Sequence, residues 1–356
     1  MAISLGIVGC GDISNFHAAA IEAVSAKIRF AACCDIDRAR AEAWAKRYDV
    51  PGAYSSLEEM LEAETLDAVL LATWPNLHRE QVEICLEKGV TNILCEKALT
   101  ITGSEASEIW EMVVSVDAFL MEGFMYRHHP AILRMEHSIS SGEIGEVDYI
   151  RAAFNAYDPE IQPAGDPDLN WRQRPDQGGG VPYDFACYAI NACGHFAGDI
   201  PRRVYAAGSV SAKYQVLDRM FGIIEYINGR VGIVESTKKA DSNQELAVLG
   251  SVGTLRLPIA WTISDDIAIT REFHPDWAIP RHDTYTIPQT NAYTEQLENF
   301  ADVVNGNAKP RVPLAQSVVN AFVTEGLVNS VLEGGYVEIT IPDRIEKAYH
   351  HTLEEQ

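Results

Sequence analysis

The first third of the sequence alternates short apolar runs with segments of helical periodicity, and this alternation strongly restricts the possible folds. The apolar runs occur at residues 3–8, 30–34, 68–72, 92–95 and 118–122. The segments that we predict to be helical lie between them, at residues 17–24, 38–48, 79–88 and 104–114. Strands that alternate with helices pair in parallel through right-handed crossovers. We therefore expect residues 1–123 to form an α/β domain with a doubly wound parallel sheet.

Residues 124–356 have a different pattern and are expected to form a second α/β domain. After a predicted helix at residues 130–141, extended segments follow one another at residues 147–157, 203–212, 220–227, 230–237, 244–250 and 253–257. Asn228-Gly229, between two of these segments, is typical of a β-hairpin. The pattern predicts a large, mostly antiparallel sheet, closed by helices near residues 294–304 and 314–332.

Composition excludes several classes of function. The net charge of −23, from 28 basic and 51 acidic side chains, argues against nucleic acid or an anionic membrane as a partner. No stretch reaches the ~20 apolar residues that span a membrane, and the N-terminus lacks the basic region of a signal peptide. The seven cysteines form no Cys-x-x-Cys pair. We therefore expect no metal site, and reduced thiols in a cytoplasmic protein.

A glycine-rich turn predicts a dinucleotide site. The first predicted strand ends in the sequence Gly9-Cys10-Gly11-Asp12-Ile13-Ser14, which has G-x-G-x-x-G spacing with serine as its third member. Gly9 permits the tight turn, Gly11 lets a pyrophosphate approach the backbone, and the following helix supplies N–H donors. Asp35, which ends the next strand, would bind both ribose hydroxyls and repel a 2′-phosphate. We predict NAD as cofactor, with NADP also possible because Arg38 lies close by.

Two further segments carry residues suited to alcohol–ketone interconversion. Glu96 and Lys97 follow an apolar strand at the edge where doubly wound sheets bind ligands, and a partly desolvated lysine there can stabilise an alkoxide. When this segment is taken alone, Lys97 is equally well interpreted as an ordinary surface lysine that follows a strand. Asp184 and Tyr188 lie four residues apart on one face of a predicted helix, with Asn191 one turn further. A tyrosine hydroxyl can act as acid or base, although core packing and helix capping explain this segment better when it is taken alone.

Together these segments resemble a known family in their order and spacing. Gly9-x-Gly11, Glu96-Lys97 and the segments 122–127 and 178–188 resemble the Gfo/Idh/MocA (glucose–fructose oxidoreductase/inositol dehydrogenase) family over nearly the whole chain. The resemblance implies a Rossmann domain and a C-terminal α/β domain whose open sheet often forms the oligomer interface. It also implies NAD(P)-dependent oxidation or reduction of a sugar or polyol. Tyr188 stands where most members have histidine, as in the subgroup of glucose–fructose oxidoreductase, xylose dehydrogenase and dihydrodiol dehydrogenase.

The resemblance and the residue types together assign roles to individual residues. Lys97 is expected to stabilise the alkoxide, Tyr188 to exchange the hydroxyl proton, and Asp184 to position the sugar or Lys97. Cofactor contacts are expected from Gly9, Gly11, Asp12, Ile13, Asp35, Arg38, Thr73, Trp74, His78, Glu96, Lys97, Arg127, Trp171 and Arg172. Substrate contacts are expected from Lys97, Tyr126, Trp171, Arg172, Asp184, Tyr188 and Asn191.

The sequence departs from the family pattern at two places. Ala98 replaces the proline that in relatives commonly follows a cis peptide bond. A cis bond before a non-proline residue costs ~2.5–4 kcal/mol, so we expect this bond to be trans. In the segment 72–78, His78 keeps its place, but Trp74 and Pro75 stand where relatives have Pro-Asn.

Two other functions are compatible with the same residues. The chain could cleave a glycoside by using NAD transiently, since oxidation at C3 of a sugar acidifies the neighbouring C–H bond. It could also be a cofactor-binding regulator without turnover, although the presence of both Lys97 and Tyr188 disfavours this function. The sequence does not separate the dehydrogenase from the glycoside-cleaving enzyme.

The sequence also suggests how the protein assembles. Residues 220–227 and 231–234 are almost continuously apolar, whereas a strand with one wet face would alternate. A monomer rarely exposes an apolar patch beyond a few hundred Å². We therefore expect a homodimer, or a homotetramer built from dimers, through the C-terminal sheet.

Overall fold

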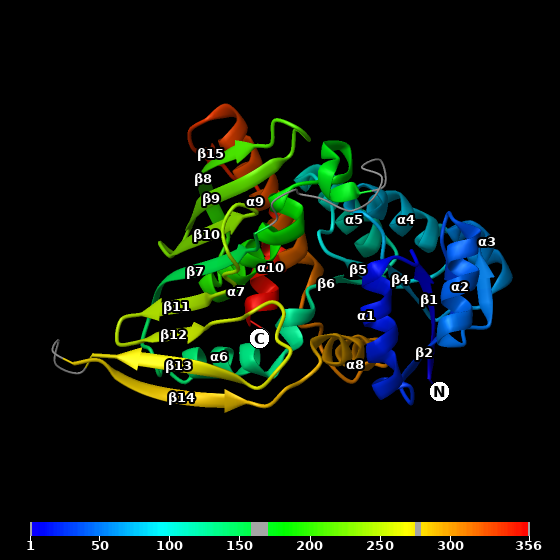
Figure 1. Ribbon diagram of the computed structural model, residues 1–356, viewed down its shortest axis with the longest axis horizontal. Helices are drawn as coiled ribbons and strands as arrows, with labels where there is room; N and C mark the ends of the chain where they lie inside the picture. The colour runs from blue at the N-terminus through cyan, green and yellow to red at the C-terminus, as the bar shows by residue number, and fades with distance from the viewer. Residues whose placement is uncertain (1, 158–169, 275–278, 355–356) are drawn as a thin grey trace. The chain divides into compact units, whose positions relative to one another are not determined.

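The computed structural model describes residues 2–157, 170–274 and 279–354, which form two compact units (Figure 1). The first unit comprises Met1–Thr100, Ser104–His128 and Asn291–Leu314. The second comprises Ile101–Gly103, His129–Thr290 and Ala315–Gln356. The sequence pattern places residues 291–314 in the second domain, but in the structure they pack with the first unit. Lys27 Nζ, for example, lies 2.7 Å from Glu298 Oε1.

The first unit contains a six-stranded sheet in the order β3-β2-β1-β4-β5-β6. Its strands are β1 (Ile3–Val8), β2 (Ile28–Cys34), β3 (Gly52–Tyr54), β4 (Ala68–Leu71), β5 (Asn92–Glu96) and β6 (Phe119–Gly123). Its helices are α1 (Asp12–Ile21), α2 (Arg38–Tyr48), α3 (Leu57–Ala63), α4 (Pro75–Glu87), α5 (Gly103–Ser115) and α8 (Ala292–Val304). Each pair of neighbouring strands is parallel, which confirms the predicted doubly wound fold.

This topology places several of the predicted cofactor residues along one edge of the sheet. The strand order reverses between β1 and β4, and ligands of open α/β sheets bind at the carboxyl ends of strands beside such a reversal. Asp35 follows β2 directly, Thr73 lies two residues after β4, and Lys97 follows β5 directly. Because carboxyl ends of parallel strands meet at the same edge, these residues and the glycine-rich turn after β1 share it.

The second unit is built on a nine-stranded sheet in the order β14-β13-β12-β11-β7-β10-β9-β8-β15. Its strands are β7 (Val147–Asn155), β8 (Pro201–Val210), β9 (Leu217–Tyr226), β10 (Val231–Thr237), β11 (Leu246–Gly250), β12 (Thr254–Leu257), β13 (Ile267–Phe273), β14 (Arg281–Ile287) and β15 (Val337–Glu338). Its helices are α6 (Pro130–Ser140), α7 (Cys187–Ala197), α9 (Leu314–Glu333) and α10 (Asp343–Glu354). The sheet is mostly antiparallel, as predicted, but β7 and β10 pair in parallel.

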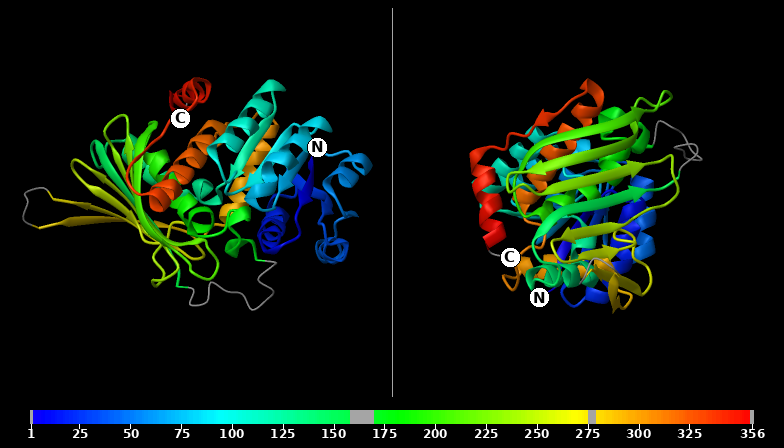
Figure 2. Two further views of the ribbon diagram at one scale, coloured as in Figure 1. Left: turned by 90° about the horizontal axis from the view of Figure 1, so that it is seen from above. Right: turned by 90° about the vertical axis from the view of Figure 1, so that its left-hand side faces the viewer.

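Helices cover one face of this sheet. Helix α7 packs on β7 and β10, and α9 packs on β8 and β9, where Ser330 Oγ accepts a hydrogen bond of 2.8 Å from Ala206 N–H. No described helix lies over the opposite face of β8, β9 and β10 (Figure 2). Tyr205, Phe221 and Ile223 are exposed on that face. The apolar residues of β9 thus face both sides of the sheet, as the sequence suggested.

The structure confirms the predicted hairpin and adds elements that the sequence pattern did not reveal. Strands β9 and β10 pair antiparallel on either side of Asn228-Gly229. Strands β13 and β14 were not predicted, and β14 carries mainly polar side chains, none of them buried. Helix α10 was not predicted either, since only Ile345 and Tyr349 bury side chains on it. None of the described helices is long and apolar enough to cross a membrane.

Candidate active site

The glycine-rich turn has room for an anion at the start of α1. Gly9 has φ +92°, and a Cβ atom there would lie 2.6 Å from the Ala72 carbonyl oxygen. Gly11 is the N-cap residue of α1, and a Cβ atom there would meet no described atom within 4 Å. No described side chain caps this helix, so its first N–H groups and its positive dipole end can receive a negative charge. These residues fit the pyrophosphate of a dinucleotide.

Asp35 is held rigidly at the end of β2. Its Oδ2 accepts a hydrogen bond of 2.9 Å from Cys10 N–H, and its Oδ1 accepts one of 2.9 Å from Asp37 N–H. Arg40 Nη1 lies 3.7 Å from Asp35 Oδ1, whereas Arg38 pairs with acidic residues of α2 and α3. The cation next to Asp35 is therefore Arg40, which the sequence did not single out, rather than Arg38.

The loop that carries Lys97 differs from our expectation. The peptide bond between Lys97 and Ala98 is cis, so the expected trans bond is wrong. His78 Nδ1 lies 3.2 Å from the Ala98 carbonyl oxygen and 3.0 Å from that of Leu99. Glu122 Oε1 accepts a hydrogen bond of 2.8 Å from Leu99 N–H. These tertiary contacts hold the loop. Our expectation considered only the intrinsic preference of one peptide bond and did not include such contacts.

His78 connects two loops of the ligand edge. It is fully buried, and its Nε2 lies 3.2 Å from the Thr73 carbonyl oxygen after β4. Burial lowers its pKa, which favours the neutral imidazole. Trp74, at the N-cap of α4, and Thr73 are half-buried beside this contact. The structure thus gives His78 a positioning role between the loops after β4 and β5, and its contact with a cofactor stays a prediction.

Glu96 forms a buried pair with a residue that the sequence did not suggest. His17 Nε2 on α1 lies 2.7 Å from Glu96 Oε1, and both side chains are buried. Glu96 Oε2 accepts a hydrogen bond of 3.2 Å from Lys97 N–H. The His17 ring packs edge-on against Tyr293 of α8, with ring centroids 5.1 Å apart. No local spacing could have revealed the pair, because its members are 79 positions apart.

Tyr126 and Arg127 lie in a 3₁₀ turn, Met125–His128, just after β6. Tyr126 is almost completely buried, with its ring edge-on to Phe124 at 6.1 Å. Arg127 is also buried, and its Nη2 donates a hydrogen bond of 2.8 Å to the Arg311 carbonyl oxygen. Their contacts with substrate and cofactor stay predictions.

In the second unit, Asp184 is paired with two cations. It lies in a π-helical turn, Pro182–Ala186, that leads into α7, where we had expected regular helix. Both carboxylate oxygens accept hydrogen bonds of 3.1 Å from Arg172 Nε. Lys238 Nζ lies 3.1 Å from Asp184 Oδ2, with both of these side chains buried. The sequence did not single out Lys238, which follows β10 with no motif around it. Single π-helical turns often occur at functional sites.

The glycines before this turn allow the chain to approach itself. A Cβ atom on Gly179 would lie 2.7 Å from the Arg174 carbonyl oxygen and 2.8 Å from that of Trp171. Gly180 N–H donates a hydrogen bond of 2.9 Å to the Arg172 carbonyl oxygen. These glycines let the 3₁₀ turn Trp171–Gln173 pack closely, which brings Arg172 to Asp184.

Tyr188 lies among aromatic side chains. Its buried ring has its centroid 5.5 Å from that of Phe154 and 5.9 Å from that of Trp261. Phe154 in turn stacks on Phe185 at 4.5 Å. Trp261, which the sequence did not single out, donates a hydrogen bond of 2.8 Å from Nε1 to the Ala153 carbonyl oxygen. The arrangement offers an aromatic surface beside a phenol hydroxyl.

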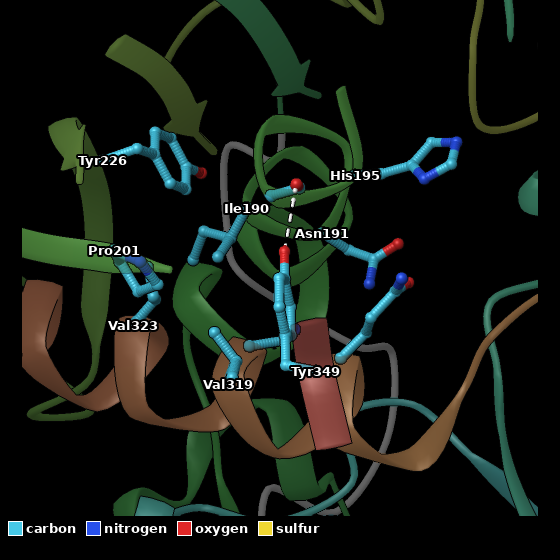
Figure 3. A pocket seen from close by; sticks show the side chains of 11 residues that line it. Ile190, Asn191, His195, Pro201, Tyr226, Val319, Val323 and Tyr349 are labelled. Carbon is cyan, nitrogen blue, oxygen red and sulfur yellow. Dashed lines mark hydrogen bonds between the residues drawn. The ribbon is translucent and has the colours of Figure 1, made fainter. Parts of the chain in front are cut away.

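Asn191 lines a cavity of about 20 Å³ within the second unit. Figure 3 shows it on α7 near His195, with Val319 and Val323 of α9 and Tyr349 of α10. The Tyr349 hydroxyl donates a hydrogen bond of 3.3 Å to the Gly194 carbonyl oxygen. The cavity has room for about one water molecule, so it is too small for a sugar. The predicted contact between Asn191 and substrate stays a prediction.

Comparison with known proteins assigns the family. Residues 3–124 match the model of the NAD-binding Rossmann fold of the Gfo/Idh/MocA oxidoreductases, and residues 137–339 match the model of their C-terminal α/β domain. The chain belongs to the Gfo/Idh/MocA oxidoreductase family. It is therefore an oxidoreductase whose Rossmann domain binds NAD(P). Among the described residues, no three His, Cys, Asp or Glu side chains are grouped as metal ligands.

The chain is similar to two named dehydrogenases and to a reductase of known structure. It is 32% identical over 309 residues to D-xylose 1-dehydrogenase (NADP(+)) 2 of Haloferax volcanii, an alignment that covers 87% of this chain and 91% of that protein. It is 29% identical over 262 residues to trans-1,2-dihydrobenzene-1,2-diol dehydrogenase of Xenopus tropicalis, covering 72% and 76%. A 3-ketoreductase from Actinomadura kijaniata, solved with NADP and TDP-benzene, shares the fold with a TM-score of 0.80 at 23% identity, covering 94% and 98%.

Proposed function

We propose that this oxidoreductase transfers a hydride between NAD(P) and the hydroxyl-bearing carbon of a sugar, polyol or glycoside. The observation that carries the proposal is the surroundings of Tyr188, a phenol among aromatic rings that follows Asp184 by one helical turn. An aromatic surface suits the C–H face of a sugar or cyclic diol, and a paired carboxylate suits its hydroxyls. Two of the relatives, a xylose dehydrogenase and a dihydrodiol dehydrogenase by name, support this substrate class.

Three side chains divide the chemistry between them. In the oxidation, Tyr188 acts as a base in its phenolate form, and its oxygen takes the proton of the substrate hydroxyl to become the neutral phenol. The Lys97 ammonium stabilises the negative charge that develops on the substrate oxygen. Asp184, ionised between its two cations, accepts a hydrogen bond from a neighbouring substrate hydroxyl and so fixes the orientation of the ring. The bound nicotinamide supplies the hydride acceptor, and reduction of a ketone or aldehyde follows the same path in reverse.

The residues around Arg172 contribute the remaining substrate and cofactor contacts of the proposal. The Arg172 guanidinium lies 5.0 Å from the centre of the Trp171 ring, a cation–π distance that keeps the two side chains together. The Arg172 side chain is 45% exposed. This pair is thus accessible to a ligand, with an aromatic face and guanidinium donors side by side.

For the cofactor, the proposal is a preference for NAD over NADP. Asp35 is fixed by two backbone N–H groups, and its negative charge would repel a 2′-phosphate. Arg40, which is half-exposed, lies close enough to Asp35 to reduce this repulsion. The name of the Haloferax volcanii relative specifies NADP(+), so the experiment compares the two cofactors directly.

A substrate screen with both cofactors tests the proposal. Aldoses, cyclic polyols and glycosides are each incubated with NAD or NADP, and the absorbance of the reduced cofactor and the carbon products are followed in parallel. Oxidised product formed in step with reduced cofactor supports the proposal. Cleaved glycoside without net reduced cofactor would identify the glycoside-cleaving alternative. Cofactor binding without turnover of any compound would identify a regulator.

Matched variants then test the assigned roles. Tyr188→Phe should lower kcat by about 10²–10⁴-fold, as expected for a positioned acid or base. Lys97→Ala should lower turnover strongly while NAD binding, measured by fluorescence titration, persists. Tyr226→Phe is the control, since it removes the hydroxyl of another buried tyrosine of the same unit. Near-normal rates for Tyr188→Phe and Lys97→Ala would contradict the assignment.

A further inference from the structure

The cavity inside the second unit lies where several elements meet that are far apart in the sequence. It has a volume of about 20 Å³, and residues of α7, α9, α10 and the strands β8 and β9 line it (Figure 3). Part of its wall is apolar, and the polar part consists of Asn191, His195, Tyr226, Gln316, Asn320 and Tyr349. A volume of this size holds about one water molecule.

Tyr226, at the end of β9, brings a hydroxyl group to the cavity. The residue is 4% exposed, and burial raises its pKa well above the usual value of 10.0, so the hydroxyl stays protonated. A Cβ atom on Gly194 of α7 would lie 3.9 Å from this hydroxyl, which Figure 3 shows directed toward α7. None of the described residues accepts a hydrogen bond from it. A buried hydroxyl without an acceptor is unfavourable, so the cavity needs an occupant that accepts a hydrogen bond.

Asn320 brings the complementary group from α9. The residue is 6% exposed, and its Oδ1 atom accepts no hydrogen bond from any described residue. It lies one helical turn from Gln316 and from Thr324, which are also buried. An amide oxygen buried in this way is unfavourable unless a donor reaches it. The cavity is thus bordered by one donor and one acceptor that no described residue satisfies.

Size and charge restrict what can occupy the cavity. The described residues that line it include no Asp, Glu, Lys or Arg, so an ion would be buried there without a counter-charge. The imidazole of His195 already pairs with Glu136, with 2.6 Å between Nε2 and Oε1. An apolar molecule would leave both Tyr226 and Asn320 unpaired and would exceed the volume. Water fits, because it accepts and donates hydrogen bonds.

We propose that the cavity is a binding site for one ordered water molecule, which accepts a hydrogen bond from the Tyr226 hydroxyl and donates one to Asn320. This water joins β9 to α9 beside α7, the helix that carries Tyr188. Buried water of this kind is part of the structure and is costly to remove. It touches neither substrate nor cofactor, and the inference does not depend on the proposed function.

Thermal unfolding of a conservative variant tests the site, because the sign of the effect depends on the water. With water bound, Tyr226→Phe removes a hydrogen bond and should lower Tm by about 2–4 °C. Without water, the same change removes a buried hydroxyl that has no partner, so Tm should stay constant or rise, and this result would overturn the inference. Tyr336→Phe is the matched control, since Tyr336 belongs to the same unit and is 55% exposed. This control should leave Tm unchanged.

A double variant tests whether the two residues share one bound molecule. Asn320→Leu keeps the shape of the side chain and should lower Tm, since the water loses its acceptor. Tyr226→Phe/Asn320→Leu should lower Tm by less than the sum of the two single changes, because each change alone already weakens the same bound water. Additive changes in Tm would contradict a shared water.

A crystal structure at high resolution provides the direct test, and it does not require that any variant fold. One water oxygen should lie within about 3.2 Å of both the Tyr226 hydroxyl and the Asn320 amide. The inference is wrong if the cavity contains no ordered density or if Tyr226 bonds directly to Asn320. It is also wrong if the density has the contacts of a metal cation, which are shorter than about 2.6 Å.

Discussion

Replacement of His17 by phenylalanine tests how strongly the buried Glu96 depends on its partner. His17 Nε2 lies 2.7 Å from Glu96 Oε1, and the two side chains are 0% and 5% exposed. A phenyl ring keeps most of the volume of the imidazole and its edge-on packing against Tyr293. It removes the hydrogen bond, so that Glu96 keeps the N–H of Lys97 at 3.2 Å as its donor.

The size of the effect follows from burial. A buried charged group that loses a hydrogen-bond partner costs about 1.5–3 kcal/mol. We therefore expect His17→Phe to lower the free energy of unfolding by about 2–3 kcal/mol at pH 7.

Equilibrium urea unfolding, followed by tryptophan fluorescence, measures this loss. The control is Lys88→Met, which breaks an ion pair of the same unit with the same length. Lys88 Nζ lies 2.7 Å from Glu62 Oε1, but these side chains are 36% and 66% exposed. Solvent screens such a pair, so the control should cost less than about 1 kcal/mol. If His17→Phe shifts the urea midpoint no further than Lys88→Met, our argument from burial is wrong.

Three further predictions concern the cofactor, acid stability and assembly. Asp35→Ala should narrow the preference for NAD over NADP in kcat/KM, and a wild type that turns over faster with NADP at equal subsaturating concentration would contradict the role of Asp35. Burial, with the charges of Arg127 and Arg311, lowers the pKa of His128 from 6.5 to about 3. Its contribution to stability is therefore complete above pH 6.5 and decreases as the pH falls toward 3, by about 2 kcal/mol between pH 7 and pH 5. Urea unfolding at pH 7 and pH 5 should show that His128→Gln loses less free energy of unfolding between the two pH values than the wild type does. Light scattering coupled to gel filtration should give a dimer or tetramer that Phe221→Lys weakens, whereas a mass near 39.3 kDa for the wild type would refute assembly through the sheet.

Local sequence signals were sufficient for the first unit's fold and for part of its ligand edge. Gly9, Asp35 and Lys97 each come directly after an apolar strand, and the regular alternation with helices implies that these strand ends meet at one edge. Every step of this inference uses residues within a few positions of one another. The structure confirms the parallel sheet, and it adds the backbone donors that hold Asp35.

The pairs around the predicted catalytic residues were decided only by the tertiary structure. His17 and Glu96 are 79 positions apart, and Lys238 meets Asp184 across the end of a strand. The packing of residues 291–314 with the first unit also depends on contacts between distant segments, such as the pair of Lys27 and Glu298. The apolar residues of a helix or strand recur at a regular spacing in the sequence, because all residues of the element share one local geometry. A contact between distant segments produces no such regular spacing, since it depends on how whole elements pack.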